Sequence, residues 1–76
     1  MTTLQYNQQM QIAYAVSTAY RDLTEAPIFS ADYWQADSVL DLQIKKLADF
    51  LCLELNTRTK NYLVAYALNL VRTSLN

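Results

Sequence analysis

The chain has 76 residues, of which 53% are hydrophobic, and its seven acidic and six basic residues give a net charge of −1. A chain of this length forms one hydrophobic core, so we expect a single domain over residues 1–76. The chain has no glycine and no histidine, which excludes glycine-rich phosphate loops, serine–histidine–aspartate triads and zinc sites that use histidine.

Helical periodicity predicts the first helix over residues 4–23. Apolar side chains recur there at spacings of three and four residues, and polar side chains occupy the opposite side. The apolar stripe comprises Tyr6, Met10, Ala13, Ser17 and Tyr20, with Ile12, Val16, Ala19 and Leu23 beside it. We expect Pro27 to end this helix, because the residue before a proline is disfavoured in the helical conformation.

The sequence permits two solutions for where the second helix begins. Ser30 can accept the N–H groups of the turn that follows it, whereas Ser38, with Asp41 three residues later, approximates a capping box. In the first solution one helix covers residues 31–55. In the second, a short additional helix at residues 31–36 precedes the main helix.

We favour the second solution, with the main helix beginning at Val39, because Asp37 and Ser38 prefer caps to helix interiors. The strongest periodic signal of the chain lies in this main helix and predicts its core stripe. That stripe comprises Leu40, Ile44, Leu47, Leu51 and Leu55.

The third helix is predicted over residues 59–74. Asn56 tolerates the left-handed conformation that commonly follows a helix, and Thr57 or Thr59 can cap the next one. The apolar stripe comprises Val64, Leu68, Val71 and Leu75, widened by Leu63, Ala67 and Leu70. The fold that we predict is all-α: a small antiparallel three-helix bundle with a tight helical hairpin between the last two helices.

Apolar residues exceed the number that three amphipathic helices bury. On the second helix Val39, Leu42, Phe50 and Leu53 lie off the core stripe. They stay exposed unless the segment around Trp34 folds over them or a partner covers them. A homodimer suits a chain too short for a large core and without a second cysteine, and another protein is the other option.

Tyr and Trp side chains offer large contact areas with a polar tip and are enriched at interfaces. The partner-binding residues that we predict are Trp34, Phe50, Leu53, Tyr62 and Tyr66. The segment 27–34 is unusually aromatic for a linker, so we expect it either to pack onto the bundle or to contact another chain.

A nucleic-acid-binding regulator is the alternative function. The hairpin has the outline of a helix-turn-helix, and Lys45, Lys46, Arg58 and Lys60 would form its basic patch. The turn lacks the customary glycine, and the low net charge provides no extended phosphate-binding surface. We therefore favour a protein partner over nucleic acid.

Nothing in the sequence points to catalysis, a metal or a cofactor. Cys52 has no histidine to act as its base, and Asp32, Asp37 and Asp41 are explained as helix caps and favourable charges at a helix start. The first nine residues lack the features of a signal peptide, and the longest apolar stretch, residues 62–68, is too short to span a membrane. We predict a cytoplasmic, non-enzymatic protein–protein interaction or adaptor module.

Overall fold

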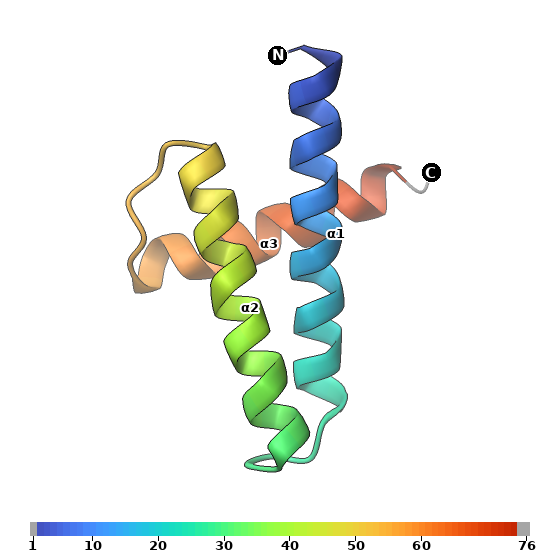
Figure 1. Cartoon of the computed structure of the whole chain (residues 1–76), viewed down its shortest axis with the longest axis vertical. Helices are drawn as coiled ribbons and strands as arrows, with labels where there is room; N and C mark the ends of the chain where they lie inside the picture. The colour runs from blue at the N-terminus through green and yellow to red at the C-terminus, as the bar shows by residue number, and fades with distance from the viewer. Residues whose placement is uncertain (1, 75–76) are drawn as a thin grey trace.

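The computed structural model describes residues 2–74, which form three α-helices (Figure 1): α1 (Thr3–Glu25), α2 (Ala31–Phe50) and α3 (Thr57–Ser74). None of residues 2–74 forms a β-strand. The all-α, three-helix fold predicted from helical periodicity is confirmed. Leu75, predicted to extend the apolar stripe of the third helix, lies outside the described residues.

The helices form two layers. α1 and α2 lie side by side in antiparallel directions, and α3 crosses behind both of them (Figure 1). Although α3 follows α2 in the chain, it contacts α1 more extensively than α2. The Cα atoms extend over 40 × 29 × 17 Å, and the shortest extent fits two layers because packed helices lie about 8–10 Å apart. The α1–α2 layer is therefore covered by a helix on one side only.

The core lies where the three helices meet. Small side chains on α1, notably Ala13 and Ala19, let the other helices approach closely, and Ile44, Leu47 and Leu63 fill the space between them without solvent exposure. The buried cluster comprises Ala13, Val16, Ala19, Leu40, Ile44, Leu47, Ala48, Leu63, Ala67 and Val71. The predicted stripes of all three helices contribute to it.

α1 begins at a capping box. The Gln5 N–H donates to Thr2 Oγ1 at 3.1 Å, and the Thr2 N–H donates to Gln5 Oε1 at 2.9 Å. The helix therefore begins one residue before the predicted range of residues 4–23 and ends two residues after it. Residues 3–8 are exposed and form an arm that extends past the end of α2 (Figure 1).

α2 is one continuous helix, so the predicted break, with a separate short helix at residues 31–36, is wrong. Ser30 is the N-cap, and its Oγ accepts the backbone N–H three residues later at 3.1 Å. Ser38 is exposed inside the helix. Ala36 and Leu40, on either side of Ser38, are both buried against the bundle, and their burial outweighs the preference of Ser38 for a cap.

α2 ends at Phe50, five residues before the predicted limit, so Leu55 is exposed and does not belong to the core stripe. Cys52 adopts a left-handed conformation (φ 59°). The Leu53 N–H donates to the Ala48 carbonyl at 2.8 Å, and the Cys52 N–H donates to the carbonyl three residues earlier at 3.2 Å. These two hydrogen bonds form a Schellman motif, which ends the helix.

Because Cys52 takes the left-handed position, Asn56 caps α3 instead of ending α2. Asn56 Oδ1 accepts the Thr59 N–H at 3.0 Å, and α3 begins at Thr57, two residues before the predicted start. Residues 51–56 lead the chain away from the end of α2, and α3 then crosses α2 instead of running back along it (Figure 1). The last two helices therefore form a wider corner than the tight hairpin predicted.

Candidate functional site

A row of apolar side chains lies on a side of α2 that no other helix covers. Val39 and Leu42 are 42% and 53% exposed, and Phe50 is half-buried. At 100° per residue these three side chains fall within about 80° of one another. Leu53, just beyond the helix, is 39% exposed. We call these four residues the outer strip.

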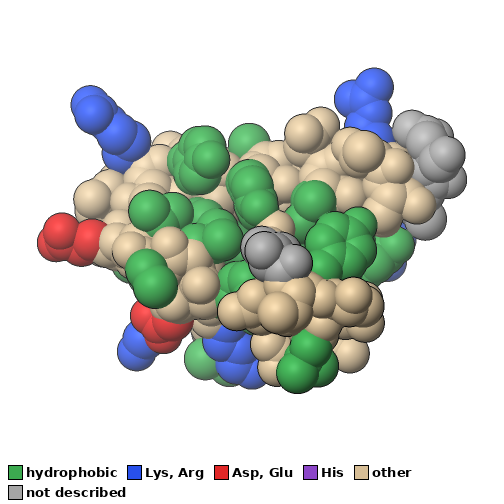
Figure 2. Space-filling model, turned by 90° about the horizontal axis from the view of Figure 1, so that it is seen from above, with side chains coloured by type: hydrophobic (Ala, Val, Ile, Leu, Met, Phe, Trp, Pro, Cys, Tyr) green, Lys and Arg blue, Asp and Glu red, His purple; other side chains and the backbone are tan. Residues whose placement is uncertain are grey.

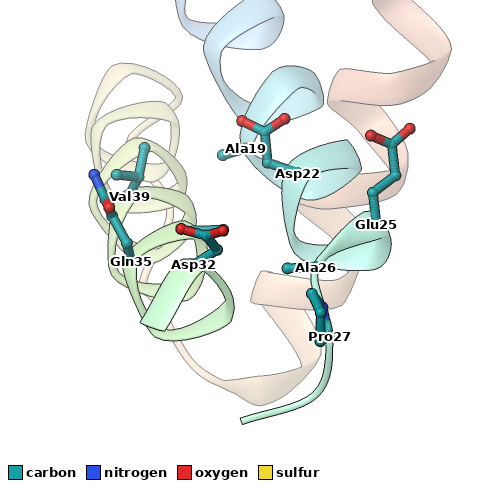
Figure 3. Close-up of a pocket in the computed structure, with 9 residues that line it drawn as sticks. Ala19, Asp22, Glu25, Ala26, Pro27, Asp32, Gln35 and Val39 are labelled. Atoms are coloured by element: carbon teal, nitrogen blue, oxygen red, sulfur yellow. The ribbon is translucent and has the colours of Figure 1, made fainter. Parts of the chain in front are cut away.

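A cleft of about 460 Å³ lies between α1 and α2 beside Val39. Asp22 of α1 and Asp32 of α2 lie on facing sides of it, and α3 lies behind (Figure 3). Glu25 also lines the cleft, and none of the described residues that line it is basic. The uncovered face of the α1–α2 layer is therefore acidic at the end where α2 begins.

α2 carries charges of both signs. Asp32 and Asp37 lie in the first half of the helix, and Asp41, Lys45, Lys46 and Asp49 lie in the second half. Asp32 lies in the first turn, where the helix dipole favours a negative charge, whereas the last turn contains no basic residue. The one ion pair within residues 2–74 joins Asp41 to α3, so the other five charges are left for solvent or a partner.

The α1–α2 turn carries an aromatic cluster. Phe29 stacks on Trp34 with 5.7 Å between the ring centroids, and Tyr33 meets Trp34 edge-on at 5.3 Å. A hydrogen bond of 3.1 Å across residues 27–30 closes a turn in which Phe29 has φ 66° and is 70% exposed. The cluster remains at the turn and leaves Val39 and Leu42 uncovered, so the segment 27–34 does not pack over the outer strip.

The five predicted partner-binding residues do not form one patch. Trp34 is near the start of α2 and Phe50 is at its end, about 24 Å away along the helix axis. Phe50 and Leu53 belong to the outer strip. Tyr62 and Tyr66 lie on α3, in the other layer, with 6.0 Å between their ring centroids.

Tyr66 is held by Gln9, a buried polar residue that the periodicity analysis did not single out. Gln9 is 3% exposed, its Nε2 donates to the Tyr66 hydroxyl, and its Oε1 has no hydrogen-bond partner in the described structure. Its position was detectable, because Gln9 lies four residues before Ala13 and seven before Val16 on the same buried stripe. Tyr66 therefore has a structural role, and Tyr62, 56% exposed, is the free tyrosine of the pair.

The four cations of the nucleic-acid alternative are distributed over two helices. Lys60 Nζ lies 2.6 Å from Asp41 Oδ1, and this hydrogen bond raises the pKa of Lys60 above its ordinary value. Lys45, Lys46 and Arg58 are exposed. In Figure 2 the Lys and Arg side chains stand at separate points around the edge of the face, and hydrophobic side chains occupy its middle. The described cations seen there form no continuous patch.

The remaining candidate groups add no site. Cys52 is free and exposed, and residues 2–74 contain no cluster of three or more ligand-type side chains that could hold a metal ion. None of the three helices, over the part of the chain described, combines the length and hydrophobicity needed to cross a bilayer. Comparison of the chain with protein-family models, with curated proteins and with solved structures found no match.

Proposed function

We propose that this protein is a small non-enzymatic protein–protein interaction module that self-associates through the outer strip. The observation that carries the proposal is the uncovered apolar row on α2, with Val39 and Leu42 at one end and Phe50 and Leu53 at the other. Burial of apolar surface yields about 25 cal/mol per Å², so a partner that covers this row is held by the hydrophobic effect.

The total surface area supports the same proposal. The protein exposes 5384 Å², about 600 Å² more than the surface of roughly 4,800 Å² expected for a compact monomer of 8.8 kDa. Stable interfaces bury about 800 Å² on each partner. The excess surface is therefore comparable with the area that one interface removes.

A second copy is the partner that we propose. A small helical domain with a single cysteine has no disulfide to stabilise it, and pairing of two identical faces provides the missing core. The exposed free thiol of Cys52 favours a reducing compartment such as the cytoplasm. Tyr62 and the aromatic cluster stay outside the outer strip and are available to a further protein in an adaptor role.

Light scattering after gel filtration, over a wide concentration range, tests the proposal. We expect the wild-type protein to be a dimer and Leu42→Glu to be a monomer with unchanged helix content. Tyr62→Glu is the matched control, because Tyr62 is exposed to a similar degree on the other layer. A wild-type protein that is monomeric at every concentration refutes self-association. If Tyr62→Glu dissociates the dimer and Leu42→Glu does not, the outer strip is not the interface.

A further inference from the structure

A second cleft lies where α3 crosses the α1–α2 layer, and we call it the rear cleft. Its volume is about 410 Å³, and small-molecule sites, which commonly lie between the helices of a bundle, have volumes of about 300–1,000 Å³. All three helices line it. Its walls are aliphatic side chains: Leu23 of α1, Leu40 of α2, and Val64, Ala65 and Leu68 of α3.

The remaining residues that line the rear cleft are polar. They are Tyr20, Asp37, Lys60 and Asn61. Tyr20 and Asn61 are exposed, and Asp37 and Lys60 are half-buried. Small-molecule sites combine apolar walls, which hold the ligand, with a few polar groups, which fix its orientation. The rear cleft has this composition.

The charges at the rear cleft leave one carboxylate unbalanced. Lys60 Nζ lies 2.6 Å from Asp41 Oδ1, so these two charges neutralise each other. Asp37 takes part in no ion pair within residues 2–74. Arg21 and Arg58 are exposed and line no part of the cleft. A ligand in the rear cleft therefore meets an excess of negative charge, which attracts a cation and repels an anion.

Tyr20 favours a ligand of the same sign. The face of an aromatic ring attracts an ammonium group that lies within about 6 Å of the ring centre. Tyr20 precedes Leu23 by three residues on α1, so its ring stands next to the aliphatic wall of the cleft. An apolar group and a positive charge on one ligand can therefore be bound together.

We infer that the rear cleft binds a small hydrophobic amine. Its protonated nitrogen lies beside Asp37 and Tyr20, and its apolar body contacts the aliphatic walls. The inference does not depend on self-association. At 100° per residue, Asp37 points about 160° away from Val39 and about 140° away from Leu42 around α2. The rear cleft and the outer strip are therefore separate surfaces, and a dimer formed through the outer strip leaves the cleft uncovered.

Three naphthalene derivatives of similar size and different charge test the inference. At neutral pH naphthylmethylamine is a cation, naphthylmethanol is neutral and naphthoic acid is an anion. Each is titrated into the isotope-labelled full chain, and NMR chemical shifts are recorded, because ligands of this size bind with dissociation constants on the order of 1 mM. We expect the amine to cause saturable shifts that are largest around the rear cleft and small at Val39 and Leu42.

The dissociation constants should follow the charge. We expect the amine to bind about 2–5-fold more tightly than the alcohol, which is the range for a partly exposed ion pair, and the acid to bind more weakly than both. Asp37→Asn should remove most of the preference for the amine and leave binding of the alcohol unchanged. Asp49→Asn is the matched control, because Asp49 is exposed on α2 and does not line the cleft.

Filling of the rear cleft provides a second readout. Ala65 is exposed, so Ala65→Leu places a larger side chain in the cleft without changing the core, and it should weaken binding of the amine several-fold. Ala31→Leu is the matched control, because Ala31 is exposed on α2 and lies outside the cleft.

Two results would overturn the inference. Shifts of the wild-type protein that are largest at Val39 and Leu42, or that do not saturate, would show that the rear cleft is not a binding site. An amine that binds no more tightly than the alcohol or the acid would show that the cleft does not select a cation. Neither result bears on self-association, which light scattering measures separately.

Discussion

Gln9 of α1 donates a hydrogen bond to the hydroxyl of Tyr66 of α3, and the two residues are 57 positions apart in the sequence. The bond satisfies only half of a buried amide, because Gln9 Oε1 has no partner in the part of the chain that is described. A buried polar atom without a partner costs about 1–3 kcal/mol. The pair therefore defines where α3 crosses α1 more than it stabilises the fold.

Removal of one member of this pair should cost more than removal of both. Tyr66→Phe leaves the Gln9 amide without any partner, so we expect it to lower the free energy of unfolding by about 1–3 kcal/mol. Gln9→Met combined with Tyr66→Phe should restore wild-type stability or exceed it. Urea unfolding of the two single variants and the double variant measures the coupling, and additive effects would contradict the account.

Cys52 follows the end of α2 in the left-handed conformation (φ 59°), which glycine adopts at a lower cost in free energy. A residue with a Cβ atom loses about 1–2 kcal/mol in the left-handed region. We expect Cys52→Gly to raise the free energy of unfolding by up to about 1 kcal/mol, since the more flexible unfolded chain offsets part of the gain. Thermal unfolding measures this, with Cys52→Ala as the control that retains Cβ. A less stable glycine variant would argue against the Schellman motif.

The two serines that compete for the start of α2 should respond differently to alanine. Ser30→Ala removes the oxygen that accepts the Tyr33 N–H and should cost about 1 kcal/mol. Ser38→Ala lies on an exposed side inside the helix, where alanine has the higher helix propensity, so its effect should be neutral or slightly stabilising. Chemical denaturation of both variants compares them directly. If Ser38→Ala lowered the free energy of unfolding more than Ser30→Ala, Ser38 would be a helix cap and the helix would break at residues 37–38, as the sequence predicted.

The Lys60–Asp41 ion pair should contribute a small stability that disappears at high pH. The pKa of Lys60 is raised in the folded protein above its ordinary value of 10.5, so the pair stabilises the fold fully below that pH. The contribution is lost as the pH rises through the raised pKa. Because both side chains are partly exposed, the contribution should be about 0.2–1 kcal/mol.

The measurement for this ion pair is the difference in unfolding free energy between wild type and Lys60→Met, recorded from pH 8 upward. That difference should stay constant up to about the ordinary lysine value and then fall toward zero. A difference that persists after lysine deprotonation would assign the role of Lys60 to packing of its aliphatic chain.

Helical periodicity was sufficient to predict the helices, because each has an apolar stripe that the bundle buries. It could not locate their ends. Ser38 has the chemistry of a cap, but burial of Ala36 and Leu40 keeps the helix continuous. Nothing in the chemistry of Cys52 favours a left-handed residue, so the end of α2 depends on the hydrogen bonds that Leu53 and Cys52 make to the last turn.

The candidate surface was predicted in part. The periodicity of α2 placed Val39, Leu42, Phe50 and Leu53 off the core, and they form the outer strip. The grouping of Trp34 with Tyr62 and Tyr66 could not be assessed without the path of α3, which lies across the α1–α2 layer and separates them. The acidic cleft could not be predicted from the sequence either, because it forms only where Asp22 of one helix faces Asp32 of the other.

The crossing of α3 over α1 also leads to an expectation for the order in which the helices assemble. α1 and α2 are joined by a five-residue turn, 26–30, whereas α3 is tied to α1 by contacts such as that between the Tyr14 hydroxyl and Ser74 Oγ, 60 residues apart. Short loops close with less loss of entropy than long ones. We therefore expect the α1–α2 pair to form first, and α3 to dock last and detach first, with the fastest exchange of its amide hydrogens.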